Sequence, residues 1–190
     1  MVQKACIKMV LALFVLLWTP TSLLAAALGP QQVEAYLDSL AEVKQLGERM
    51  KAAGQGTFLA REISPKAGES FDPHQRAVMA LKREHDDHYK ALILIVQQRG
   101  FTSPESWARV GDRVVLAYGA IKAESESPEM LLLAKQMKGM DPQMLQLLPA
   151  EQRVQVEQAL IIAEALARVP EADKHQVLPH IARLDREFTQ

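Results

Sequence analysis

The strongest constraint on the fold is a helix-start signal that recurs along the chain, a Ser or Asp followed directly by Pro. Four of the five such pairs precede a periodic stretch and are taken as signals, Asp72-Pro73, Ser103-Pro104, Ser127-Pro128 and Asp141-Pro142; the fifth, Ser64-Pro65, lies in a segment without periodicity. A short polar side chain can cap the first turn of a helix, and proline fits the first helical position, where no backbone donor is needed. Each signal precedes a stretch of apolar residues, so the sequence predicts a succession of helices.

The apolar residues recur at spacings of three and four, which place them on one stripe of a helix. The stretch 73–100 forms one helix only if it continues through the charged residues 84–87. No stretch alternates with period two, so we predict no strand. The predicted fold is all-α, a compact bundle of six or seven helices. The predicted helices cover residues 31–50, 73–100, 104–121, 130–138, 150–169 and 171–188, the last kinked or restarted at Pro179.

The first 27 residues have the organisation of an export signal. Lys4 and Lys8 precede an apolar run over residues 9–24, and three alanines follow it. We expect cleavage after Ala27, with the bonds after the other two alanines as alternatives. A retained membrane anchor is the weaker interpretation, because Pro20 interrupts an apolar core that is already short for a span.

Cleavage after Ala27 leaves residues 28–190, which we expect to form a single helical domain. Cys6 leaves with the signal, so the mature chain has no cysteine for disulfides or thiol chemistry. No second long apolar run follows. We therefore expect no membrane span in the mature chain and a periplasmic location, with secretion as the alternative.

Composition and motifs reduce the number of function classes that fit this chain. A net charge of -1 and 5% aromatic residues argue against a nucleic-acid partner. Standard catalytic signatures are missing, which lowers the expectation of an enzyme, although a hydrolase using Glu84 with Asp87 is conceivable. We expect a periplasmic protein-interaction module of the chaperone, adaptor or inhibitor/immunity type, whose partner is another envelope protein.

Residues 51–72 lack periodicity, and we expect an irregular loop there. Loops longer than about 12–15 residues are uncommon in compact domains unless they are functional or disordered. This one carries four large apolar residues, and we expect them to cover the bundle or, as the alternative, to bind a partner. They are Phe58, Leu59, Ile63 and Phe71.

A group of methionines follows in the second half of the chain. Met137, Met140 and Met144 come after Met130 at spacings of seven, three and four. Core packing is the favoured interpretation, a groove that binds a partner is the second, and thioether binding of copper is the third.

The densest polar cluster is a candidate metal site. His85 and His88 are three residues apart, and Glu84 and His88 are four apart, so these groups share one face of a helix. Imidazole and carboxylate ligands suit zinc or copper. A solvated charged face is the favoured interpretation, so no cofactor is expected and a zinc or copper site is the alternative.

One helix carries an unusual polar feature. Asp112 lies between Arg109 and Arg113 and beside Gly111. Glycine in a helix interior costs about 1 kcal/mol relative to alanine, so we expect a neighbouring helix to approach closely there. Asp112 paired with an arginine is a candidate polar clamp on that contact, and a pair on the surface of the helix is the favoured alternative.

This region also carries a resemblance to a family. The segments 101–107 (FTSPESW) and 110–114 (VGDRV), followed by Ala117-Tyr118, resemble a family of small exported helical proteins of Gram-negative bacteria. The likeness extends weakly from Val33 to Phe188. The resemblance implies export and an all-α fold, and it carries no activity or site residues.

Overall fold

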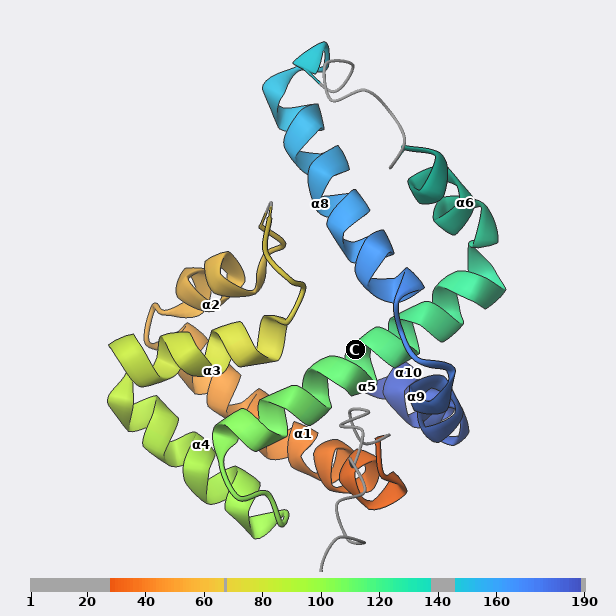
Figure 1. Cartoon of the computed structure of the whole chain (residues 1–190). Helices are drawn as coiled ribbons and strands as arrows, with labels where there is room; N and C mark the ends of the chain where they lie inside the picture. Colours follow the sequence, from red (N-terminus) through yellow and green to blue (C-terminus); the bar gives the residue numbers. More distant parts are fainter. Residues whose placement is uncertain (1–27, 67, 138–145, 189–190) are drawn as a thin grey trace, which may run out of the picture.

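The computed structural model describes residues 28–66, 68–137 and 146–188. Every regular element within these ranges is helical, which confirms the all-α fold (Figure 1). A 3-10 turn, Leu178–His180, joins the last two helices. The α-helices are α1 (Pro30–Ala52), α2 (Gly56–Ile63), α3 (Pro73–Glu84), α4 (Asp86–Gln98), α5 (Pro104–Glu126), α6 (Pro128–Met137), α8 (Ala150–Ala167), α9 (Glu171–Val177) and α10 (Ile181–Phe188).

Helix α5 is the central element of the bundle. It contacts α1, α3, α4, α6, α8 and α9, and Figure 1 shows it running diagonally between them. Small buried residues, among them Ala108, Gly111 and Ala117, allow these neighbours to approach its backbone. Trp107 and Val114 on the same helix are larger and belong to the buried hydrophobic core.

The local signals at the start of α5 act as predicted. The hydroxyl of Ser103 accepts a hydrogen bond from the Ser106 N–H at 3.2 Å, and the Ser106 hydroxyl accepts one from the Ser103 N–H at 3.1 Å. Just before, Gly100 has a φ of +86° and ends the preceding helix, while the Phe101 N–H donates to the Val96 carbonyl at 3.1 Å. This is the expected left-handed glycine stop.

The predicted helix over 73–100 is divided in two. His85 leaves the helical region, with φ −140° and ψ 62°, and separates α3 from α4. The charged residues supply the reason, because Lys82 and Arg83 lie in the last turn of α3 and Asp86 and Asp87 in the first turn of α4. Those positions suit the dipoles of two separate helices rather than of one.

The expectation of an irregular loop over 51–72 is wrong for its first half. Helix α1 continues to Ala52, Gly54 reverses the chain with a φ of +78°, and α2 then forms eight residues from Gly56. Two turns with no side-chain cap give little periodic signal in a sequence. The helix is stabilised by the packing of Phe58 and Leu59 against the core rather than by local helix signals.

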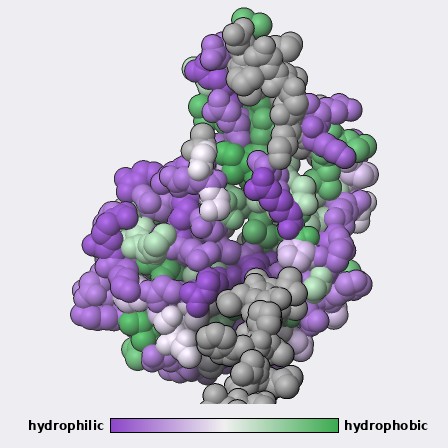
Figure 2. Space-filling model, viewed as in Figure 1, coloured by the Kyte–Doolittle hydropathy of each residue, from purple (hydrophilic) through white to green (hydrophobic). Residues whose placement is uncertain are grey.

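The second half of the chain forms an arm and a terminal unit. Helices α6 and α8 pack against each other and extend away from the body in Figure 1, and Figure 2 shows apolar surface on this arm. The chain then returns through α9 to α10, with Pro179 in the 3-10 turn between them, which confirms the predicted kink. No helix within the described ranges is long and apolar enough to cross a membrane.

Candidate functional site

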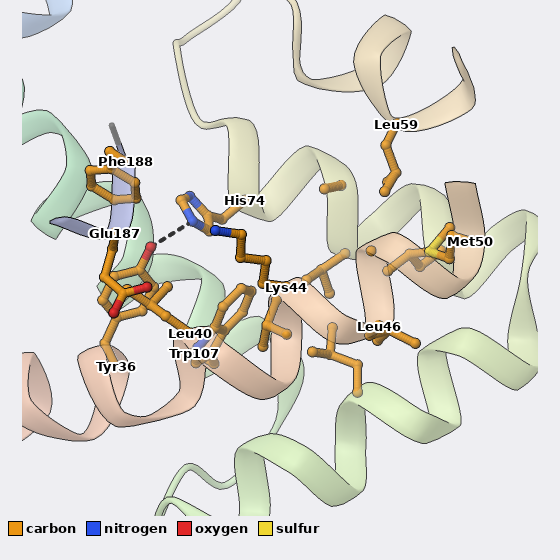
Figure 3. Close-up of a pocket in the computed structure, with 16 residues that line it drawn as sticks. Tyr36, Leu40, Lys44, Leu46, Met50, Leu59, His74, Trp107, Glu187 and Phe188 are labelled. Carbon is orange, nitrogen blue, oxygen red and sulfur yellow. Dashed lines mark hydrogen bonds between the residues drawn. The ribbon is translucent and has the colours of Figure 1, made fainter. Parts of the chain in front are cut away.

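A cavity of about 350 Å³ opens into the hydrophobic core between α1, α2 and α3, and we call it the core pocket. Its wall is almost entirely carbon, and Figure 3 shows these side chains pointing into it from three sides. Helix α1 contributes more of the lining residues than any other helix, and Leu59 of α2 closes one side. The apolar lining includes Leu40, Val43, Met50, Leu59, Val78 and Leu81.

Tyr36 and His74 line one end of the core pocket (Figure 3) and belong to a chain of three polar side chains. The Tyr36 hydroxyl lies 2.9 Å from Nε2 of His74, and Nδ1 of His74 lies 2.9 Å from a carboxylate oxygen of Asp112 (Figure 3 marks the first bond). A carboxylate only accepts, so Nδ1 carries the proton. In the neutral ring Nε2 then accepts a hydrogen bond from the Tyr36 hydroxyl.

Asp112 also holds the start of α3. Its carboxylate accepts the backbone N–H of His74 at 2.7 Å and that of Gln75 at 3.2 Å, together with the Gln75 side-chain amide at 3.0 Å. These two N–H groups are among those that a helix leaves unbonded at its start. Asp72, expected as the cap of this helix, forms no side-chain capping bond, so a residue from α5 replaces it.

Burial keeps the Tyr36 hydroxyl protonated. Burial raises the pKa of the Tyr36 hydroxyl far above its usual range, and the charge of Asp112 raises it further. Tyr36 is fully buried. It is therefore a fixed hydrogen-bond donor rather than a nucleophile, and the three side chains position α1, α3 and α5 around the core pocket.

A second buried hydrogen-bond pair supports the same wall. The indole N–H of Trp107 donates to the Ser39 hydroxyl at 2.8 Å, and that hydroxyl donates to the Tyr36 carbonyl at 2.6 Å. A buried indole N–H needs such an acceptor. Trp107 consequently faces the core pocket with one fixed orientation.

The open side of the core pocket carries charge. Lys44 of α1 is exposed there, and Figure 3 shows its side chain extending along the pocket. Glu187 and Phe188 at the end of α10 lie on the same rim. The pocket thus combines an apolar interior with one cation and one carboxylate at its edge.

The four apolar residues predicted between 51 and 72 divide into two groups. Phe58 and Leu59 on α2 pack against the core, as expected of a cover, and Leu59 lines the core pocket. Ile63 is 41% exposed. Phe71 is half-buried and lines a separate groove beside α8 and α9. The structure therefore does not bring the four together on one surface.

The metal-site residues are engaged with other groups. Glu84 pairs with Arg83 through its Oε1 at 2.6 Å, and the ring of His85 packs edge-on against Phe58 with centroids 4.5 Å apart. The rings of His85 and His88 have centroids 6.0 Å apart. Within the described ranges no group of three or more His, Cys, Asp or Glu is arranged to hold a metal ion.

The predicted methionine group lies mostly outside the described residues. Met137 is the last residue of α6, and Met140 and Met144 fall in the range 138–145, which is not described. Neither the partner interpretation nor the copper interpretation is tested at these positions.

The predicted pairing of Asp112 with Arg109 or Arg113 is wrong. Asp112 is buried, and its bonds go to His74 and Gln75 rather than to a neighbouring arginine. Arg113 instead binds Asp173 of α9, and Arg109 is exposed. The favoured surface pair on α5 is therefore wrong for Asp112. The close approach at Gly111 is confirmed, since a Cβ there would lie 2.7 Å from Tyr36 and 2.9 Å from His74.

Sequence analysis missed Tyr36, Ser39 and His74 as parts of the site. A signal was available, because Ser39 falls among the apolar residues of α1 and a polar residue on a core-facing stripe needs a partner. His74 follows Pro73 and gave no comparable signal.

Comparisons of the chain with family models, curated proteins and solved structures found no match. What the site binds has to follow from its own geometry.

Proposed function

We propose that this protein is an exported binding protein of the periplasm that takes up an anionic amphiphile, an alkyl carboxylate, in the core pocket. The observation that supports it is the cavity of about 350 Å³, whose carbon wall ends beside the cation of Lys44. Small-ligand sites are typically cavities of about 300–1,000 Å³, mostly apolar with a few polar groups that fix orientation. The export signal in residues 1–27 supports the location.

The roles of the residues follow from their places. The apolar wall takes the alkyl chain, since transfer of apolar surface from water is favourable. Lys44 attracts the carboxylate at the rim, whereas Glu187 on the same rim repels it. Tyr36, His74 and Asp112 hold the wall in shape and do no chemistry on the ligand.

Trp107 gives a direct assay for this proposal. It is the single tryptophan of residues 28–190, because the other is Trp18, and it lines the core pocket. Titration of the mature chain with sodium decanoate, below the concentration at which it forms micelles, should change Trp107 emission and saturate at one ligand per chain. Calorimetry checks the stoichiometry. Absence of saturable binding would contradict the proposal.

Gly47 allows the pocket to be filled without a clash. It lies on α1 in the pocket wall, and a Cβ added there meets nothing within 4 Å. Gly47→Leu should abolish decanoate binding while the helical circular dichroism is kept. Gly47→Ala is the matched control, because it makes the same backbone change and leaves most of the cavity open. Undiminished binding by Gly47→Leu would place the ligand elsewhere.

The rim charges should act in opposite directions. Lys44→Met should weaken decanoate binding and leave decanol binding unchanged, and Glu187→Gln should strengthen decanoate binding. Lys51→Met, on the same helix but away from the pocket wall, is the control. Equal effects on the acid and the alcohol would contradict recognition of the carboxylate.

A protein partner bound by the α6–α8 arm is the second candidate, and it keeps the expected role of an interaction module for another envelope protein. One observation favours it. Helix α8 carries apolar residues on every side, yet none of its residues is buried, and Val154 is 49% exposed. On α6, Leu132 is 62% exposed. Apolar surface gathered on one element is typical of an interaction site.

Leu132→Gln tests this second candidate with a close control. Leu94 on α4 is 63% exposed, so Leu94→Gln makes the same change at the same exposure on the body. Capture from periplasmic extract should lose one stoichiometric protein with Leu132→Gln only. Equal capture by both variants would contradict a role for the arm.

A further inference from the structure

Leu28 is the residue that follows the expected cleavage bond, and both its side chain and its backbone nitrogen have partners in the folded domain. Its side chain is 1% exposed and belongs to the hydrophobic core. Its backbone N–H donates to Oδ1 of Asp173 at 3.3 Å. The backbone nitrogen at position 28 is therefore held against a carboxylate 145 residues further along the chain.

Asp173 is an unusual partner for a backbone amide. It is 2% exposed, and Arg113 binds both of its oxygens, through Nε to Oδ2 at 2.8 Å and through Nη2 to Oδ1 at 2.6 Å. A carboxylate is costly to bury unless charged donors compensate it. Oδ1 therefore has two donors, the guanidinium of Arg113 on α5 and the nitrogen of Leu28.

We propose that Asp173 is the intramolecular acceptor for the amino terminus that cleavage after Ala27 creates, so that processing strengthens the fold. This inference rests on the export that is part of the proposed function. Hydrolysis of the Ala27–Leu28 amide by one water yields a carboxylate on Ala27 and an ammonium on Leu28. The neutral donor at 3.3 Å becomes a cationic one, and charge-assisted hydrogen bonds are about twice as strong as neutral ones.

The acceptor also selects among the three alanine bonds. Cleavage one or two residues earlier would leave a neutral amide at position 28, so the nitrogen that Asp173 contacts would not carry the new charge.

Two forms of the mature chain test the proposal. One begins at Leu28, released from a fusion by a protease that leaves no extra residue, and the other carries one additional glycine before Leu28. Urea unfolding should give a folding equilibrium constant about fivefold larger for the chain that begins at Leu28. In Asp173→Asn this ratio should fall to one. Where that variant does not fold, Nα-acetylation of Leu28 keeps an N–H without the charge and should remove the same gain.

The results separate the parts of the argument. Equal stability of the two chains, or a ratio that survives Asp173→Asn, would overturn the proposal. The mass of the protein isolated from the periplasm should correspond to residues 28–190, and a terminus at any other residue would also overturn it. If the terminus and the stability ratio are as expected but decanoate does not bind, only the proposed role of the core pocket is contradicted.

Discussion

One carboxylate oxygen of Asp112 accepts two hydrogen bonds from the same residue, the backbone N–H of His74 at 2.7 Å and its Nδ1 at 2.9 Å. His74 is the second residue of α3, so the first bond satisfies an N–H that the helix leaves free. The second fixes the imidazole that lines the core pocket. A single side chain of α5 thus caps a neighbouring helix and orients the inner wall of the site.

Asp112→Asn should therefore be costly although it changes the shape of the side chain little. An amide has one acceptor oxygen, and its NH₂ group would face donors that the second carboxylate oxygen now satisfies. We expect a loss of about 2–3 kcal/mol in the free energy of unfolding, measured by urea denaturation. Trp107 emission should change as well, since His74 packs edge-on against its ring with centroids 5.3 Å apart. Wild-type stability would show that Asp112 does not cap α3.

Asp72→Asn should have the opposite effect. Burial raises the pKa of Asp72, and the charge of Asp112 raises it further. A carboxyl pKa raised by folding means that the ionised form weakens the folded state above that pKa, and that the cost disappears as the pH falls through it. Asparagine caps as well as aspartate. The variant should gain roughly 0.5 kcal/mol at pH 7, a small gain because solvent screens the charge of this partly exposed side chain, and the gain should vanish in unfolding experiments below about pH 4.

The parts of this fold that the sequence predicts are those that depend on interactions between residues close together in the chain. The cap at Ser103 and the left-handed stop at Gly100 depend on residues within a few positions. The spacing of apolar residues predicted a helix over 31–50, and α1 spans Pro30–Ala52. The helix α2 was missed because two turns are stabilised by contacts with the core and not by their own sequence.

The candidate site depends on partners far apart in the chain. Tyr36 and His74 are 38 residues apart, as are His74 and Asp112, and Ser39 and Trp107 are 68 apart. From the sequence alone, Asp112 had two arginines as nearest candidates. In the structure Asp112 instead accepts hydrogen bonds from His74 and Gln75 at the start of α3. Gly111 was the useful clue, since its missing side chain marks where α1 and α3 meet α5.

Gly111 and Gly47 should respond in opposite ways to alanine. A Cβ at position 111 would lie 2.7 Å from the Tyr36 ring and 2.9 Å from His74, so α1 or α3 must shift. A Cβ at position 47 meets nothing within 4 Å. We expect Gly111→Ala to lower the free energy of unfolding by about 1–3 kcal/mol. Gly47→Ala should raise it by up to about 1 kcal/mol through helix propensity. The same sign for both in thermal or urea unfolding would contradict the close approach at Gly111.

Glu105 links three helices through one oxygen and gives the chain an acid-sensitive contact. Its Oε1 accepts hydrogen bonds from Lys82 at 2.9 Å and from Tyr89 at 2.8 Å, and the bond from Lys82 is the larger cause of a pKa lowered to about 2.

A carboxyl pKa lowered by folding stabilises the protein above the unfolded value of about 4.3, and that stabilisation is lost as the pH falls from there to about 2. Glu105→Gln should therefore be less stable by roughly 1 kcal/mol at pH 7, and this difference should shrink to nothing over that interval. Glu129→Gln is the control, because Glu129 holds the same position in α6 that Glu105 holds in α5, directly after the proline that begins the helix. A loss in Glu105→Gln that is the same at every pH would mean that the residue contributes by shape and not by charge.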